Sequence, residues 1–401
     1  MIFYIIRGMY LVLLNSVDFI FGNIIEVGHQ KIANNFGVKN FYHGEAPFWF
    51  DLVLFYGGQA IFFYIIWKLY QIGFTPLDRV QDLTDVGWGD GSKRAAANRI
   101  REIQRIRKSN ELPPVYPNGW FAVAESRNIP KKQVISVSCL GETFAVFRGD
   151  DGKINILDAF CPHMGANMAV GGVVKGNCLE CPFHGWLFDG KNGVCSHIPY
   201  AKKVPDFAKV RRWPSDERNG MVFVWYDAEG RPPQWTVPAI KEIENGEYPY
   251  RGRTEHKILA HIQEIPENGS DLAHLGHLHT PNIMKGTDLA VALTANKLLD
   301  FIHHEWDGVW KPLEAPNEHR AEVTLSHSIP MFGFKPKMMD VHVRAEQVER
   351  DIMIWNNKIF PTKPMFVAED KLIPRFRRWY SQFYSKNSPR FGGFRKEGLD
   401  W

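Results

Sequence analysis

Two short motifs built from cysteine and histidine constrain this chain more than any other feature. Cys161 and His163 form a C-x-H pair, and Cys181 and His184 form a C-x-x-H pair further along the chain. Two thiolates on one iron and two imidazoles on the other are the ligands of a [2Fe–2S] centre of mixed type, which passes single electrons. Gly165 and the glycine after His184 allow tight turns beside the ligands. The motifs therefore predict an iron–sulfur domain with its ligands on two loops.

A zinc site is the alternative for the same four side chains. Cys₂His₂ zinc fingers usually place both cysteines on one knuckle and both histidines on another. Here each loop contributes one cysteine and one histidine, which favours a [2Fe–2S] cluster over zinc. The 5 cysteines among 401 residues are too few and too clustered for a disulfide framework. Sparse cysteine of this kind is typical of a reducing compartment.

The segment around the two loops has the pattern of a small antiparallel domain. Residues 144–147 and 154–157 are apolar runs on either side of the turn signal Asp-Asp-Gly at 150–152. Residues 186–188 lead into a second turn at 190–193, which begins and ends with glycine. We therefore expect an antiparallel β domain over residues 115–230.

A second group of candidate metal ligands lies downstream, at Asp271, His274, His277 and His279. Two imidazoles and one carboxylate on one face of Fe(II) leave positions open for O₂, as in non-haem iron oxygenases. Spacing alone leaves the pair of histidines open. His274 and His277 share a helix face more easily, whereas His274 and His279 require a break in the helix, for which Gly276 is available. Three surface histidines without a metal are the third interpretation.

The amino-terminal region has the composition of a membrane anchor. Residues 52–67 carry no charge, and an extension to Gly73 crosses only Lys68. A membrane span needs about 20 mostly apolar residues, so this segment qualifies. Aromatic residues near both ends suit a bilayer interface. Residues 1–22 are also apolar but contain Arg7 and Asp18, so the anchor at 1–73 is expected to have one or two spans.

A basic linker is expected at residues 74–114. Residues 93–108 combine Lys and Arg with isoleucines at every third position, from Ile100 to Ile106. This pattern predicts a basic amphipathic helix, either on an anionic leaflet or solvated. The positive-inside rule then places the rest of the chain in the cytosol. The net charge of +4 is too small to indicate a nucleic-acid partner.

From about residue 110 onwards the chain resembles the Rieske non-haem iron oxygenases, and their steroid-acting branch in particular. Three motifs carry the resemblance: D-x-x-H-x₄-H from Asp271, a D-I-M-I-W-x-x-K segment from Asp351, and R-R-W-Y-x-x-F-Y from Arg377. Respiratory Rieske proteins carry an extra cysteine in each ligand loop. Ala166 and Phe183 stand at those positions here, which argues for an oxygenase.

The resemblance implies the roles of the downstream residues. His274, His279 and Asp351 would hold a mononuclear Fe(II), with Asp340 as the second candidate for the carboxylate. Asp271 would bridge electron transfer from His184 of the cluster to the iron, usually across a subunit interface in a homotrimer. His277 would then be an additional, structural residue.

The resemblance also implies a fold and an activity. The fold class is α+β: a transmembrane helix, an antiparallel β Rieske domain, and a helix-grip (START-like) catalytic domain at 231–401. The enzyme would use O₂ and electrons from NAD(P)H, delivered by a separate reductase, to oxidise a sterol. An anchor before the Rieske domain is typical of the animal cholesterol 7-desaturases, so desaturation of cholesterol at an endoplasmic reticulum membrane is expected. A steroid hydroxylase and a non-catalytic sterol-binding or electron-carrier protein are the alternatives.

Overall fold

The computed structural model describes residues 48–88, 92–107, 112–281, 289–294, 303–328, 345–361 and 363–390. The chain divides into two compact units, one formed by Met1–Asp78 with Arg251–Arg253 and the other by the remaining residues. Both ligand motifs lie in the second unit. The predictions for residues 1–22 and for Asp340 lie outside the described residues.

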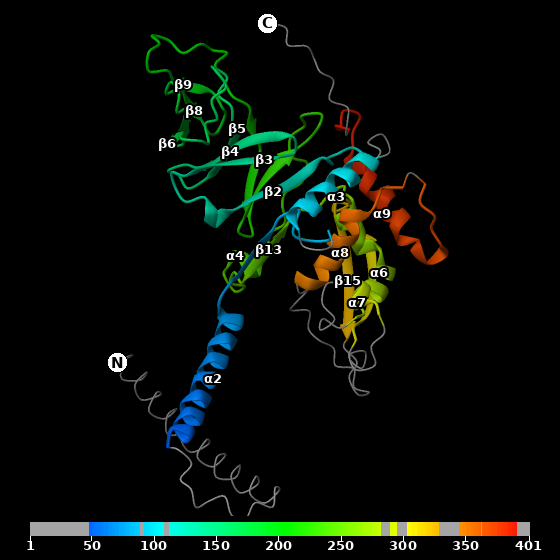
Figure 1. Cartoon of the computed structure of the whole chain (residues 1–401). Helices are drawn as coiled ribbons and strands as arrows, with labels where there is room; N and C mark the ends of the chain where they lie inside the picture. The colour runs from blue at the N-terminus through cyan, green and yellow to red at the C-terminus, as the bar shows by residue number, and fades with distance from the viewer. Residues whose placement is uncertain are drawn as a thin grey trace, which may run out of the picture. The chain divides into compact units, whose positions relative to one another are not determined.

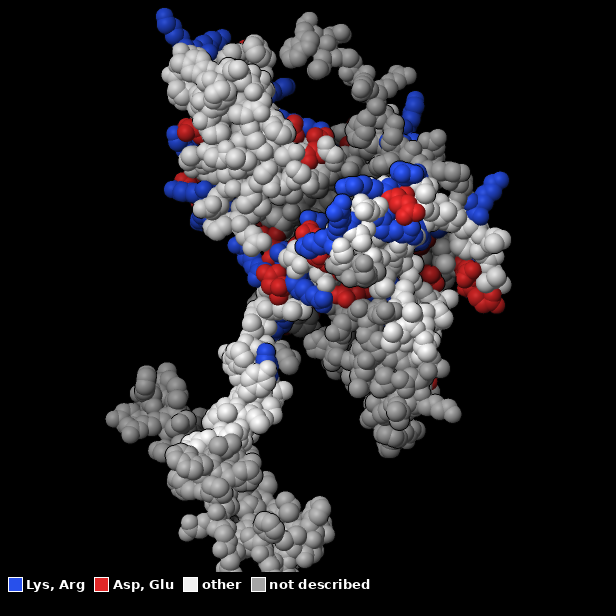
Figure 2. All heavy atoms as spheres, in the orientation of Figure 1, with Lys and Arg blue, Asp and Glu red and all other residues white. Residues whose placement is uncertain are grey.

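Helix α2, Phe48–Phe74, forms over the segment expected to be the membrane span. Many of its apolar side chains are exposed, among them Ile61, Phe63, Trp67 and Leu69. Over the part of this helix that is not grey, Figure 2 shows one Lys or Arg among uncharged side chains. The prediction of a helix is confirmed. Within the described ranges, however, none of the helices combines the length and the apolar character that crossing a bilayer requires.

Helix α3, Lys93–Ile106, is the predicted basic amphipathic helix, and its apolar face packs on the protein. Ser92 caps its first turn through an Oγ that accepts from the Ala95 N–H. Ala96, Ile100 and Ile103 are buried, whereas Lys and Arg side chains gather on the exposed face (Figure 2). The buried stripe therefore contributes to the protein core, and only the basic face remains for solvent or an anionic surface.

The Rieske segment folds as three antiparallel sheets, as expected from its turns and alternating pattern (Figure 1). One sheet has the strand order β11-β12-β2, formed by Ser215–Arg218, Met221–Tyr226 and Gly119–Glu125. The second has the order β10-β5-β4-β3, formed by Arg212–Trp213, Ile154–Asp158, Glu142–Arg148 and Val134–Cys139. The third has the order β6-β7-β8-β9, formed by Val173–Lys175, Cys178–Glu180, Leu187–Asp189 and Cys195–His197.

Two apolar cores hold these sheets together. Phe144, Val146 and Trp213 belong to the core between the β11-β12-β2 sheet and the β10-β5-β4-β3 sheet. Alternate residues of β4 point the other way, so that Phe147 packs with Leu179 and Phe188 in a second core, which also contains Cys161 and Cys181. The period of two along β4 thus supplies both cores. The second core therefore holds both ligand loops through their cysteine side chains.

The catalytic segment combines short helices with a two-stranded sheet. Strands β14 (Glu305–Pro312) and β15 (Ala321–Ser328) pair in an unbroken antiparallel register. The helices are α4 (Lys241–Glu244), α5 (Glu264–Glu267), α6 (Leu272–Leu278), α7 (Leu289–Ala292), α8 (Ala345–Asn357) and α9 (Leu372–Tyr380). Helix α6 packs on β14 at Gly308, where an added Cβ would lie 2.6 Å from a Leu325 methyl carbon and 3.3 Å from one of Leu272. In the described part of the chain, the two remaining strands are β1 (Leu77–Gln81) and β13 (Gly252–His256), which form a sheet of their own.

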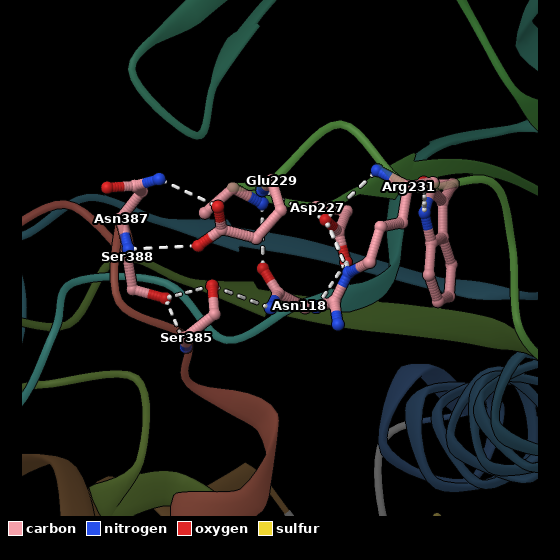
Figure 3. A network of polar contacts seen from close by, with 9 residues as sticks. Asn118, Asp227, Glu229, Arg231, Ser385, Asn387 and Ser388 are labelled. Carbon is pink, nitrogen blue, oxygen red and sulfur yellow. Dashed lines mark hydrogen bonds and ion pairs between the residues drawn. The ribbon is translucent and has the colours of Figure 1, made fainter.

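A polar network ties the end of the catalytic segment to the Rieske domain (Figure 3). Asn118 donates to the Ser385 hydroxyl over 3.2 Å and accepts from the Ala228 N–H over 2.8 Å. Glu229 accepts from both the backbone and the side chain of Asn387, over 3.0 and 2.7 Å. The two domains are therefore joined by specific contacts between residues far apart in sequence.

Candidate iron–sulfur and mononuclear metal centres

The two predicted ligand loops share one backbone design. In the first loop the Cys161 N–H donates to the Ala166 carbonyl over 2.9 Å, and the Gly165 N–H donates back to Cys161 over 2.9 Å. In the second loop Cys181 and Gly185 make the same pair of contacts, at 2.8 Å to Trp186 and 3.1 Å. Both glycines have a positive φ, 75° and 70°, which other residues rarely adopt. The loops therefore present Cys and His in the same way.

The sulfur and imidazole sides of this site differ in exposure. Cys161 and Cys181 are each 2% exposed, whereas His163 is exposed and His184 is half-buried. Burial raises the pKa of the Cys161 thiol to about 11, and the neighbouring Cys181 adds to the increase. A thiolate in such a place needs a cationic partner, and bound iron supplies one. The His163 and His184 ring centroids are 4.7 Å apart, so the two loops bring the predicted imidazole ligands together.

Aromatic side chains fix the imidazoles. The Trp186 ring stacks on His163 at 4.8 Å with an interplanar angle of 8°, and its Nε1 donates to the Tyr200 hydroxyl over 2.8 Å. Phe183 lies against His184, with ring centroids 3.9 Å apart. Phe183 occupies the position of the second disulfide cysteine of respiratory Rieske proteins, and here it contacts a predicted ligand instead.

The second predicted centre gathers His274, His279 and Asp351. One ligand atom from each lies within 4.8 Å of the other two. The His279 Nε2 is 3.1 Å from Asp351 Oδ2, and the His274 Nε2 is 3.9 Å from Asp351 Oδ1. Asp351 and His279 are buried, 7% and 5% exposed. Residues separated by more than 70 positions along the chain thus meet at one point.

The end of helix α6, and not a break within it, brings the two histidines together. The helix runs through Gly276 to Leu278, and His279 is the first residue beyond it, with a φ of −103° and a ψ of 0°. The expectation of a break at Gly276 was therefore wrong. His277 is exposed and lies outside the ligand group. The easier helical pair, His274 with His277, is not the one that the structure assembles.

Asp271 is the N-cap of α6. Its Oδ1 accepts from the His274 N–H over 3.2 Å, and its backbone carbonyl contacts the His274 ring at Nδ1. Burial opposes ionisation of Asp271, but hydrogen bonding from His274 outweighs it and lowers the pKa of the carboxyl. The Asp271 carboxylate thus lies beside a predicted iron histidine, with its Oδ1 3.9 Å from the His274 Nδ1. Its contact with His184 of a neighbouring subunit stays a prediction.

The donor set fits a mononuclear Fe(II). The His274 Nε2 is buried and has no hydrogen-bond partner among the described residues, and it faces Asp351 across 3.9 Å. A buried ring nitrogen without a partner is costly unless it binds something, and a metal ion is the natural occupant. The group opens into a cavity of about 200 Å³, lined mainly by Leu275, Trp306, Leu325 and Val348. Imidazole and carboxylate beside an apolar cavity suit O₂ chemistry on an apolar substrate.

Two residues near the metal group were not predicted. Arg350, 1% exposed, donates to the carbonyls of Leu278 and Pro281, over 3.1 and 3.2 Å. It links α8, which carries Asp351, to the end of α6. Trp306 donates from Nε1 to the His279 carbonyl over 3.3 Å. The sequence signal for Arg350 was its position beside Asp351, since an arginine next to a buried ligand needs acceptors of its own.

Family models match both halves of the second unit. The Rieske [2Fe-2S] domain model matches residues 119–208, which include all four predicted cluster ligands. The 3-Ketosteroid 9alpha-hydroxylase C-terminal domain model matches residues 224–323 and 336–384, which include His274, His279 and Asp351.

Curated proteins are similar over most of the chain. "Cholesterol 7-desaturase nvd" of Xenopus laevis is 43% identical over 385 residues, covering 81% of this chain and 84% of that protein. The protein of the same name from Drosophila melanogaster is 34% identical, covering 80% and 89%. The oxygenase component of the 3-ketosteroid-9-alpha-monooxygenase of Mycolicibacterium smegmatis is 30% identical, covering 71% and 86%.

Proposed function

The chain belongs to the Rieske oxygenases, in the family of the cholesterol 7-desaturases, and on this basis we propose that it converts cholesterol to 7-dehydrocholesterol. Like other Rieske oxygenases it uses a [2Fe–2S] cluster and a mononuclear iron. The observation that carries the proposal is the meeting of His274, His279 and Asp351 beside an apolar cavity, in a chain similar to sterol desaturases over most of its length.

The proposed ligands follow from the two sites. Cys161, His163, Cys181 and His184 hold the cluster, and His274, His279 and Asp351 hold the iron. When bound, the cluster supplies single electrons and the mononuclear iron activates O₂. Asp271 holds His274 through two contacts. A carboxylate accepts N–H donors on both oxygens, so Asp271 suits a bridge between two imidazoles.

The cavity side chains orient the sterol and exclude water. Leu275, Leu325 and Val348 offer apolar surface beside the metal group, and Trp306 adds an aromatic wall. The overall reaction removes one hydrogen from C7 and one from C8 of the sterol. Together with two electrons and one proton from NAD(P)H and one further proton from solution, these reduce one O₂ to two waters. The protein's contribution is the position of C7 and C8 relative to the metal.

Further parts of the proposal concern partners and organisation. A separate NAD(P)H-dependent reductase delivers the electrons, and the active form is a homotrimer in which Asp271 faces His184 of the next subunit. The proposed boundaries are 1–73 for the anchor, 74–114 for the linker, 115–230 for the Rieske domain and 231–401 for a helix-grip catalytic domain.

Membrane attachment at the endoplasmic reticulum, with the catalytic part in the cytosol, is also proposed. The exposed apolar and aromatic residues of α2 support it, because a monomer rarely exposes so many of them to water. The basic face of α3 supports the cytosolic side. Carbonate extraction of tagged protein from cell membranes tests it: the full chain should stay in the pellet, and recovery in the supernatant would reject the proposal.

Sterol profiling tests the activity. Cells that express the chain and receive isotope-labelled cholesterol should form labelled 7-dehydrocholesterol, measured by mass spectrometry. His279→Ala should abolish the product, whereas the matched variant His277→Ala, an exposed histidine of the same segment, should retain it. A hydroxylated sterol in place of the diene would favour the steroid hydroxylase. Unchanged product in His279→Ala cells would favour a non-catalytic sterol carrier.

A further inference from the structure

The segment between α2 and the Rieske domain packs along the helix that carries Asp351. We call residues 79–88 and 92–107 the strap. Four groups of contacts join the strap to α8, over a sequence separation of about 250 to 270 residues, as the contacts of Arg107 and Asn356 illustrate. Sequence reasoning treated this segment as part of a linker and gave it no role at the metal centre.

Arg107 contacts the carboxyl end of α8. Its Nη2 donates to the Trp355 carbonyl over 3.0 Å and to the Lys358 carbonyl over 2.8 Å, and its Nε donates to Lys358 over 3.2 Å. The last carbonyls of a helix lack partners within the helix and carry partial negative charge. A guanidinium satisfies both needs with a rigid, planar set of donors. Trp355 lies one helical turn after Asp351, so Arg107 fixes the turn that follows the proposed ligand.

The middle of the strap contacts the same end of α8. Asn356 is fully buried, and its amide donates to the Val86 carbonyl over 3.0 Å and accepts from the Leu259 N–H over 2.7 Å. Val86 packs with Ile352 and Trp355 in a small core. At Gly87 the two backbones approach so closely that a Cβ would lie 2.9 Å from Met353 Cα.

The start of the strap contacts the amino-terminal half of α8. Arg79 forms an ion pair with Glu349 over 2.9 Å, and this pair is partly exposed, so its contribution is modest. On the opposite flank of α8, Arg350 reaches the carbonyls of Leu278 and Pro281 at the end of α6. Helix α8 is therefore fixed between the strap and the helix that carries the histidines.

From this arrangement we infer that Arg107 is a positioning residue of the mononuclear metal centre, acting through α8 on Asp351. The inference rests on the proposed ligand set of His274, His279 and Asp351. A carboxylate ligand on a helix binds well only if the helix holds its depth and rotation. Partners outside the ligand shell typically change metal affinity by about 10- to 100-fold when they are removed.

Cobalt(II) binding to the full-length protein tests the inference. Protein with an intact [2Fe–2S] cluster and no mononuclear iron is titrated with Co²⁺, whose visible d–d bands report both affinity and coordination geometry. Arg107→Met should weaken Co²⁺ binding about tenfold or more and shift the bands. Arg107→Lys, which keeps the charge, should fall between Arg107→Met and wild type. Arg105→Met, which changes an exposed arginine of the same helix, should match wild type.

The possible outcomes separate the role of Arg107 from the proposed ligand set on which it rests. Wild-type Co²⁺ affinity with an unchanged spectrum in Arg107→Met would overturn the role of Arg107. If Arg107→Met yields no folded protein, judged by the EPR signal of the cluster, Gly87→Ala decides, since a Cβ there pushes the strap away from α8 without altering any charge. Wild-type affinity in Gly87→Ala would then overturn the inference. Failure of the wild-type protein itself to bind Co²⁺ would reject the proposed ligand set instead.

Discussion

The two proposed iron centres have separate sets of ligand residues. Cys161 and Cys181 are buried in the core of the Rieske domain, while His274, His279 and Asp351 meet in another part of the second unit. No side chain is shared between the two sets. Loss of one centre should therefore leave the ligands of the other in place.

Cys181→Ala tests this independence. The variant should lose the [2Fe–2S] cluster, about two irons per chain, and keep about one iron at the second centre. The reason is that a cluster held by four ligands does not persist on three, whereas the His–His–Asp group is untouched. Iron analysis measures the total iron per chain, and EPR of the reduced protein measures the cluster. Loss of all iron would contradict the separation of the two sites.

The Glu267–Arg377 pair is a buried, two-point ionic contact near the ligand helix. Arg377 donates to both carboxylate oxygens of Glu267, at 2.7 Å each, and Glu267 is 8% exposed. Glu267→Gln removes one charge and one acceptor, so the free energy of unfolding should fall by about 1.5–3 kcal/mol. Urea unfolding followed by circular dichroism measures it. Glu369→Gln, at an exposed position, is the matched control and should change little; an equal loss in both variants would refute the role of the pair.

At the scale of helices and strands, the Rieske loops could be predicted closely and the metal helix only in part. All four predicted cluster ligands lie within 24 residues of sequence (161–184), and turn residues mark each loop, so the local pattern was sufficient to predict the two loops. The histidine pair that meets Asp351 depended on where α6 ends, which is after Leu278 and not at Gly276. Asp351 was found through the resemblance, because no local pattern connects it to His279.

The contacts of the strap could not be predicted from the sequence at all. Its isoleucine spacing indicated an amphipathic helix, which the structure confirms. Val86, elsewhere in the strap, packs with α8 and with residues 258–260, more than 150 positions away, and no local pattern marks these partners. Periodicity reports that a face is apolar and says nothing of its partner.

Two truncations separate the strap from the anchor. A chain that begins at residue 79 keeps every strap contact with α8 and should retain both metal centres. A chain that begins at residue 115 also loses the buried side chains of Val86, Ala96, Ile100 and Ile103, so it should keep the cluster and lose most of the mononuclear iron. Metal content per folded protein is the measurement. Equal mononuclear iron in both chains would show that the catalytic domain needs no strap.

At the scale of the whole molecule, the open question is the path of the electron. Asp271 contacts His274 directly, and the proposed homotrimer places His184 of the next subunit on its other side. Co-expression of His184→Ala with His279→Ala tests this. Each variant alone should be inactive. In random closed trimers a productive pair of neighbours should arise with a probability of about one quarter, so activity should return to about that fraction of wild type.

The control for this experiment is a pull-down with two different tags. It must show mixed oligomers, since separate assembly of the two variants would hide any complementation. Mixed oligomers without activity would place the electron path within one chain. The same result would also remove the reason for a carboxylate at Asp271 beyond capping α6.

The uneven exposure of the cluster loops limits the directions from which electrons can reach the cluster. Tunnelling slows steeply as the gap between donor and acceptor widens, and the cysteine side of the loops is closed off by the domain core, whereas His163 lies at the surface. Electrons are therefore expected to enter and leave the cluster on its histidine side. The redox protein that reduces the cluster and the group that accepts its electron would then use the same histidine side. Reduction of the cluster and its reoxidation would therefore have to alternate during turnover.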